Sequence, residues 1–338
     1  MNESLTFAIT VFVMAAIGTV SFGVHITLLA DELAERTNLG RAVVGALFLG
    51  ALTSIAEVGT SITAALSQHP ELAVNNAVGS IAAQTAFIAL ADLAYRRANL
   101  EHAAASASNL MLIGLLLALM ALLILAAATP NLSFGVVHPV SVVLVVVYLY
   151  GMRLVAQSGE LPMWHAKSTA ETNDEETRAP APSGSMAWLW GRFAFVGLIL
   201  AGCGAMLANS GIAIAELTGL SETFVGALLT GVTSSMPELV TAITAVRIGA
   251  LTLAVSNIVG GNAFDAIIIA FADFAYVPGS IYADSGPVFL TLLATALLMN
   301  VVVLLGLLRR ERHGLGNIGL EGVVLIALYT GFVYWLVS

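Results

Sequence analysis

Long apolar stretches, separated by short polar segments, follow one another along the whole chain. Each is about as long as the ~20 residues that an α-helix needs to cross a bilayer. Lipid offers no hydrogen bonds to the backbone, and the stretches lack the alternation of a β-barrel, so we expect helices. Ten stretches qualify: 5–29, 42–67, 71–95, 105–128, 136–156, 186–210, 222–246, 251–276, 286–308 and 317–337. The pattern predicts an all-α polytopic membrane protein with about ten transmembrane helices.

Polar positions within these stretches recur at an interval of 181 residues. Residues 45–95 align without a gap with residues 226–276, and 23 of the 51 positions are identical. The matches include Ser54 with Ser235 and Glu57 with Glu238, which chance rarely produces in apolar helices. Because the interval spans five helices, an odd number, the two copies should be inverted. Inverted repeats with a site near the midplane are typical of secondary transporters.

The longest polar stretch lies between the two copies and contains Pro180 and Pro182. Its composition is typical of a flexible linker. We therefore expect a first five-helix repeat over residues 1–157, a cytoplasmic linker over 158–185 and a second five-helix repeat over 186–338.

The basic residues predict the orientation. With ten spans, all 12 Lys and Arg residues fall on one side of the membrane, and that side should be cytoplasmic. Both termini should then lie outside. No basic residue precedes the first apolar run, so we interpret it as a membrane span and not as a secretory signal, and we expect a prokaryotic inner membrane.

Composition narrows the function classes. The chain is 59% hydrophobic and only 10% charged, with a net charge of −9, so lipid must be the solvent for most of it. No basic patch indicates nucleic acid. Cys203 is the single cysteine, which excludes a disulfide framework, and the six histidines are scattered, mostly near helix ends. We expect inorganic cations and the bilayer as partners, with no permanently bound cofactor; the oligomeric state stays open.

Glu57 and Glu238 lie in the middle of matching spans. An ionised carboxylate at this depth costs at least about 3 kcal/mol. No Lys or Arg lies in the middle of any predicted span, so a structural ion pair is a weaker explanation than a bound cation.

Other oxygen-bearing residues flank the two glutamates. Hydroxyls at i−3 and i−4 share a helix face with each carboxylate, and the next helix of each copy adds an acid or an amide. Oxygen ligands of this kind suit a hard cation such as Ca²⁺. The predicted cation ligands are Glu57, Glu238, Asp265, Gln84, Thr53, Ser54, Ser234, Ser235, Ser80 and Gly261. Asp92 and Asp273 lie ~12 Å further along their helices, where we expect capping or interface roles; a place on an access path is the alternative.

Two pairs of segments resemble the α-repeats of the cation/calcium exchanger superfamily, which includes sodium/calcium exchangers. They are 231–239 with 260–265, which are close to the family pattern, and 52–57 with 79–84, which are more divergent. Ala56, Ile81 and Gln84 stand where the family usually has Pro, Asn, and Asn or an acid. The resemblance implies antiport by alternating access, with Glu57 and Glu238 as main ligands of a divalent ion.

We therefore expect a secondary active antiporter, not an enzyme, that exchanges Ca²⁺ for Na⁺ or H⁺. An antiporter for Mg²⁺ or Mn²⁺ and a passive cation channel remain as alternatives. A membrane sensor or an intramembrane enzyme is disfavoured, because no nucleophile or phosphate-binding loop accompanies the glutamates.

Overall fold

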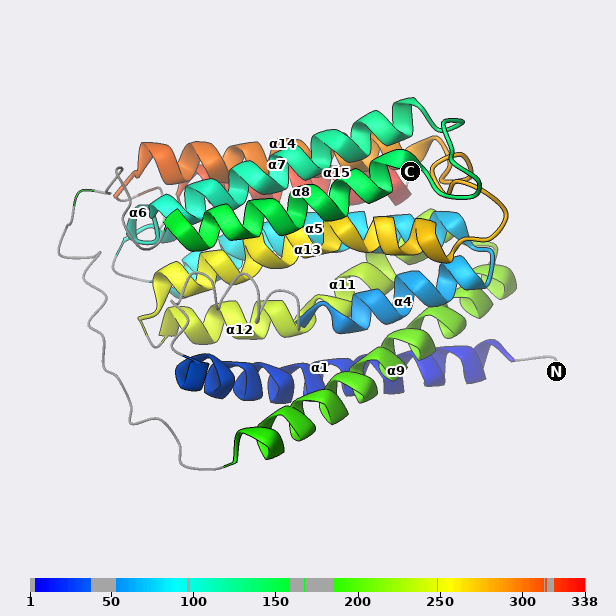
Figure 1. Ribbon diagram of the computed structural model, residues 1–338, viewed down its shortest axis with the longest axis horizontal. Helices are drawn as coiled ribbons and strands as arrows, with labels where there is room; N and C mark the ends of the chain where they lie inside the picture. Colours follow the sequence, from blue (N-terminus) through cyan, green and yellow to red (C-terminus); the bar gives the residue numbers. More distant parts are fainter. Residues whose placement is uncertain are drawn as a thin grey trace.

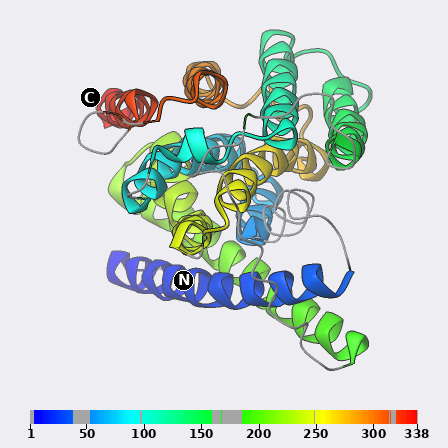
Figure 2. The same cartoon turned by 90° about the vertical axis from the view of Figure 1, so that its left-hand side faces the viewer.

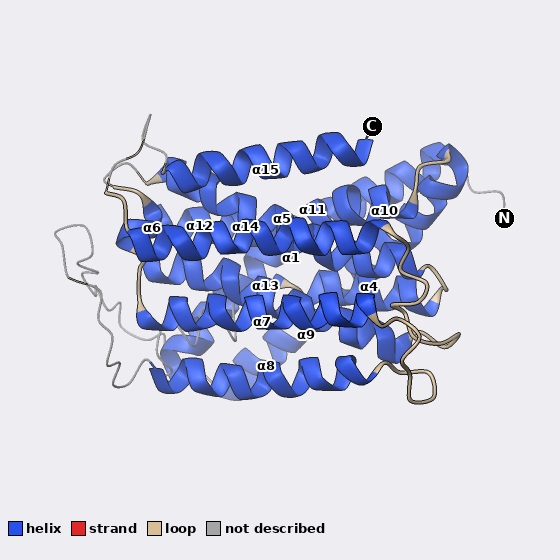
Figure 3. Ribbon diagram, turned by 90° about the horizontal axis from the view of Figure 1, so that it is seen from above, coloured by secondary structure: helices blue, strands red, loops and turns tan. Residues whose placement is uncertain are grey.

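The computed structural model describes residues 4–37, 53–95, 98–158, 167, 185–247, 249–312, 314 and 319–337. In these residues the regular structure is helical throughout (Figure 3). The first half contains α1 (Leu5–Thr37), α4 (Ile55–Leu66), α5 (Pro70–Ala94), α6 (Leu100–Ala103), α7 (Ala107–Ala128) and α8 (Pro139–Ser158). The second half contains α9 (Met186–Thr218), α10 (Glu222–Phe224), the π-helix η2 (Val225–Thr230), α11 (Gly231–Ser234), α12 (Met236–Arg247), α13 (Leu251–Ala275), α14 (Val288–Arg309) and α15 (Leu320–Val337).

The two halves repeat each other helix by helix. The first residues of α1, α4, α5, α7 and α8 lie 181 positions before those of α9, α12, α13, α14 and α15. In Figure 1, α1 runs from right to left whereas α9 runs from left to right, and α1 begins at the end where α15 finishes. The prediction of two inverted repeats in an all-α fold is confirmed.

The helices form layers around a central pair (Figures 1 and 2). α5 and α13 lie in the middle, with α7, α8, α14 and α15 on one side and α4 and α12 on the other. α1 and α9 cross the outside of the α4 and α12 layer. In the most apolar 18-residue segment of each helix, 83% of the residues of α5 and 78% of those of α13 are buried. The corresponding share is 22% in both α1 and α15. Apolar side chains on the outer helices therefore face the surroundings, as lipid-facing residues do.

Eight helices in the described part of the chain are long and apolar enough to span a membrane. The second predicted span, 42–67, is described only from residue 53 onward, chiefly by α4. The seventh, 222–246, is divided into α10, η2, α11 and α12. The predicted linker lies almost wholly outside the described residues.

The division before α12 has a counterpart before α4. Ser235 has φ −87° and ψ 0°, and Pro237 follows as the second residue of α12. A proline removes a backbone donor and disrupts the preceding turn. Ser54, the matching residue, has nearly the same geometry, φ −77° and ψ 6°, although Ala56 replaces the proline. Surrounding contacts must therefore hold the break in the first repeat.

Small residues bring the two repeats close together next to this break. A Cβ atom on Gly79 of α5 would overlap the backbone of Ala227 in η2. A Cβ atom on Gly231 would lie 3.0 Å from the carbonyl oxygen of Asn76 and 3.1 Å from the amide of Ser80. Glycine permits this backbone approach, which places η2 and α11, the segments just before α12, beside the centre of α5.

Candidate functional site

Four polar side chains from four helices meet in the interior. Glu57 is the third residue of α4 and Glu238 the third residue of α12, while Gln84 and Asp265 lie on α5 and α13. All four are 0% exposed. Both glutamates lie in the first turn of a helix, where the free amides and the helix dipole favour a negative charge. The breaks at Ser54 and Ser235 thus create, inside the bundle, two helix starts that stabilise carboxylates.

The Gln84 amide links the first glutamate to the aspartate. Its Nε2 atom lies 2.8 Å from Asp265 Oδ2, 3.3 Å from Glu57 Oε1 and 3.3 Å from Ser235 Oγ. An amide nitrogen has only two hydrogens to share among these three acceptors. The carboxylates of Glu57 and Asp265 lie beside each other, so the amide reduces the repulsion between them.

Glu57 also accepts hydrogen bonds across the repeat interface. Ser235 Oγ lies 2.6 Å from Glu57 Oε1, and Ser234 Oγ lies 3.4 Å from the same atom. The carbonyl oxygen of Gly231 is a second acceptor near both hydroxyls, and Ser80 Oγ donates to it over 3.2 Å. The first glutamate is therefore bonded to residues of the second repeat.

Glu238 has a different environment. Thr53 and Ser54 lie beside its carboxylate, which matches by repeat symmetry the position of Ser234 and Ser235 beside Glu57. However, neither carboxylate oxygen of Glu238 makes a hydrogen bond, and neither does Ser54 Oγ. The Glu57 carboxylate is close enough to interact electrostatically with it.

The structure thus brings most of the predicted ligands together. Hydrogen bonds connect Glu57, Gln84, Asp265, Ser234 and Ser235, with Ser80 joined through the Gly231 carbonyl. Gly261 is buried one turn before Asp265 on α13, and the hydrogen bonds just named do not include it.

Among the described residues, no basic side chain forms an ion pair with a carboxylate of the cluster. The ion pairs between described residues include Arg36–Glu32, His69–Glu222, Arg309–Glu311 and Arg309–Glu321, which all lie outside the cluster. Among the same residues, no three His, Cys, Asp or Glu side chains are already arranged to hold a metal ion. Because Gln84 points its amide hydrogens at the carboxylates, a cation would have to displace that amide to reach both Glu57 and Asp265.

A second buried polar group, which the sequence reasoning missed, lies next to Gln84. Thr85 Oγ1 accepts from Asn262 Nδ2 over 2.9 Å and from Asn300 Nδ2 over 3.1 Å. These bonds connect α5, α13 and α14. The sequence offered one indication of this buried polar group, because Asn300 is a polar residue in the middle of a very apolar span.

Comparison with known proteins places this architecture in a family. The family model for sodium/calcium exchanger proteins matches residues 7–157 and 188–338. The chain belongs to the sodium/calcium exchanger protein family. The resemblance seen in the sequence motifs is confirmed, and so is the expectation of an integral membrane protein. The family consists of transporters and is not an enzyme class.

Individual relatives agree with this membership. The inner membrane protein YrbG of Escherichia coli is 26% identical over 299 residues, covering 87% of this chain and 85% of YrbG. The sodium/calcium exchanger MaX1 of Methanosarcina acetivorans is 30% identical over 124 residues, 36% of this chain and 33% of MaX1. A solved structure of the sodium-calcium exchanger NCX_Mj, soaked with Na⁺ and Sr²⁺, superposes with a TM-score of 0.64 at 18% identity. That match covers 98% of this chain and 99% of the other, and it shows a shared fold.

Proposed function

We propose that this protein is a secondary active antiporter of a prokaryotic inner membrane that exchanges Ca²⁺ for Na⁺ or H⁺ by alternating access. The observation that carries the proposal is the buried cluster of Glu57, Glu238 and Asp265 with no basic partner among the described residues. Buried charges need a partner, and carboxylate, amide and hydroxyl oxygens are ligands that Ca²⁺ accepts.

The inverted repeats supply the transport step. Each repeat contributes one glutamate at the start of a half-helix, and the hydroxyls of one repeat lie beside the glutamate of the other. Movement of one repeat relative to the other would change access to the cluster while a divalent ion, or the monovalent ions that replace it, balances the charge.

The test is ion flux into proteoliposomes that contain the purified protein. Uptake of radioactive Ca²⁺ should require an outward gradient of Na⁺ or H⁺ and should stop when that gradient is dissipated. Competition by Mg²⁺ or Mn²⁺ that abolishes Ca²⁺ uptake at equal concentration would assign a different divalent substrate. Rapid uptake without any counter-gradient would contradict antiport and indicate a channel.

A further inference from the structure

Each repeat has one aspartate that accepts hydrogen bonds from two backbone amides, and the two aspartates lie at opposite ends of the bundle. We call each aspartate with its two amides an aspartate anchor. Asp92 accepts hydrogen bonds from the backbone amides of Leu100, over 2.6 Å, and Gly319, over 2.9 Å. Asp273, 181 residues later, accepts from the amides of Ile281 and His138 over 2.9 Å and 2.8 Å. The donor positions match as well, because Ile281 follows Leu100, and Gly319 follows His138, by 181 residues. Both aspartates therefore cap chain segments, as expected from their place near helix ends.

The residue after the first donor differs between the two anchors. In the second repeat it is Tyr282, whose hydroxyl lies 3.0 Å from Ser141 Oγ, which in turn donates to Asp273 over 2.7 Å. In the first repeat Glu101 occupies the matching position. Glu101 is 2% exposed, and neither of its carboxylate oxygens has a hydrogen-bond partner. A neutral, satisfied group in one repeat is thus replaced by an unsatisfied acid in the other.

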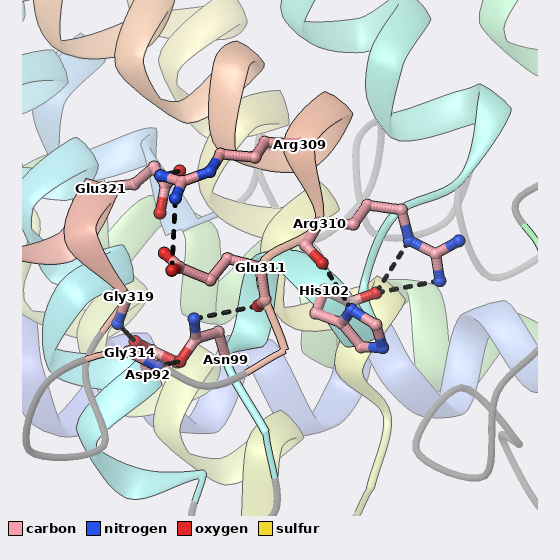
Figure 4. Close-up of polar contacts among 9 residues, drawn as sticks. All are labelled: Asp92, Asn99, His102, Arg309, Arg310, Glu311, Gly314, Gly319 and Glu321. Atoms are coloured by element: carbon pink, nitrogen blue, oxygen red, sulfur yellow. Dashed lines mark hydrogen bonds and ion pairs between the residues drawn. The ribbon is translucent and has the colours of Figure 1, made fainter.

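Glu101 shares its surroundings with Glu321. A Cβ atom on Gly306 of α14 would lie 3.2 Å from Glu101 Cγ and 2.9 Å from Glu321 Cγ, so both side chains pack against this glycine. Figure 4 shows the neighbouring polar contacts. Arg309 is shared between Glu321, at 3.4 Å, and Glu311, at 3.2 Å, and it makes no hydrogen bond with the Glu101 carboxylate.

Among the described residues, the charged groups that act on Glu101 are acidic. Asp92 on α5 and Glu321 on α15 both interact electrostatically with Glu101. The nearby Arg309 on α14 is paired with Glu311 and Glu321. The Arg310 guanidinium donates to the carbonyl oxygen of His102, whose Nδ1 contacts the Arg310 carbonyl at 2.8 Å. The first turns of α13, residues 251–256, contain no charged residue. Burial, reinforced by the negative charge of Asp92 and Glu321, raises the pKa of Glu101 to about 8.

We propose that Glu101 is a proton-binding site, separate from the central cluster, at the end of the bundle that the basic residues assign to the cytoplasm. At neutral pH it holds a proton, which leaves one fewer negative charge next to Asp92 and Glu321. Release of the proton in an alkaline cytoplasm places a third buried carboxylate where α5, α14 and α15 meet. The ligand is H⁺ itself, so no metal ion is required.

Infrared titration of the purified full-length protein tests the site directly. Between pH 6 and pH 10 the carboxyl groups of the wild type that lose their infrared absorption should include a component with a midpoint near pH 8. Glu101→Gln should lack that component. Glu216→Gln, which removes an exposed carboxylate on α9, should keep it. The same difference spectrum in wild type and Glu101→Gln would overturn the proposal.

Thermal unfolding gives a second readout. Because the folded-state pKa is raised from 4.5, the folded state binds this proton more tightly than the unfolded state does. The stabilisation is complete below about pH 4.5 and is lost as pH rises to about 8. The Tm of the wild type should therefore fall over this window more steeply than that of Glu101→Gln, and equal slopes would contradict the proposal.

A second variant keeps the test decisive if Glu101→Gln does not fold. Glu321→Gln removes a neighbouring negative charge and frees Arg309, so the midpoint of the infrared titration should move to lower pH. An unchanged midpoint would overturn the proposal. None of these readouts depends on ion transport, so their failure would leave the proposed exchange function standing.

Discussion

The two glutamates at the centre of the molecule occupy the same position in the two repeats but have different partners. Glu57 accepts from Gln84, Ser234 and Ser235, whereas both oxygens of Glu238 lack hydrogen bonds. Part of the difference follows from one substitution, because the residue opposite Asp265 is the amide Gln84, which donates to Glu57. The rest lies in the serine contacts, since Ser235 Oγ donates to Glu57 whereas Ser54 Oγ, the matching hydroxyl, makes no hydrogen bond. The Gln84 amide donates hydrogen bonds to the carboxylates of Glu57 and Asp265, whereas neither oxygen of Glu238 accepts one. Repetition therefore fixes where the carboxylates lie, and the different contacts of matching side chains decide which carboxylate is free for a cation.

The largest effect is expected for Glu238→Gln, which should abolish exchange in proteoliposomes. Loss of one charge at about 4 Å from a cation removes on the order of 4 kcal/mol per unit charge at an effective dielectric of 20. This corresponds to about a thousandfold in affinity. The variant should remain folded, since it removes a buried charge that has no hydrogen bond, and gel filtration in detergent checks this. Full transport by the folded variant would show that the glutamate is not a ligand.

Gln84→Asp should reduce the difference between the two glutamates. The substitution replaces the bridging donor by a further negative charge, so one carboxylate of the cluster should take up a proton. We expect the preference between divalent and monovalent cations to change by about tenfold, or ~1.4 kcal/mol, measured by competition in the flux assay. Gln84→Asn, which keeps the amide, is the matched control. An unchanged preference in the aspartate variant would place residue 84 outside the ion path.

Ser235→Ala and Ser54→Ala compare the two hydroxyls that repeat symmetry relates. Ser235 donates to Glu57 over 2.6 Å, whereas Ser54 Oγ has no hydrogen bond. A hydrogen bond to a charged group contributes about 1.5–3 kcal/mol, so Ser235→Ala should change the apparent ion affinity by about tenfold or more. Ser54→Ala should have the smaller effect. Equal effects would argue against the asymmetry of the cluster.

The smallest expected effect concerns stability and not transport. The turn between α4 and α5 places Gln68 at φ 62°, and the matching turn places Gly249 at φ 83°. A residue with a side chain is strained there by about 1 kcal/mol relative to glycine. Gln68→Gly should therefore raise the Tm in detergent slightly and leave exchange unchanged. A lower Tm would mean that the Gln68 side chain makes a stabilising contact that outweighs the strain.

The sequence was sufficient to predict the repeats because polar residues in apolar helices are few and their interval is constant. The 181-residue interval recurs in the helix starts throughout the described chain. The broken seventh span was predictable from Pro237, but the matching break at Ser54 was not, since Ala56 gives no local signal.

The candidate site was predictable at the level of which residues gather and not of how they bond. Gln84 was expected among the ligands, yet its amide donates to the carboxylates, because three acceptors surround it. The role of Glu101 was also hidden. Its burial depends on Gly306 and Glu321, which are more than 200 residues away in the sequence.

Equilibrium binding of radioactive Ca²⁺ to the purified protein, compared between the wild type and the double variant Glu57→Gln/Glu238→Gln, tests most directly whether the interior carboxylates exist to hold a cation. We expect saturable binding that Na⁺ or H⁺ displaces in the wild type, and loss of that binding in a double variant that is still folded. Undiminished Ca²⁺ binding by the double variant would contradict this expectation.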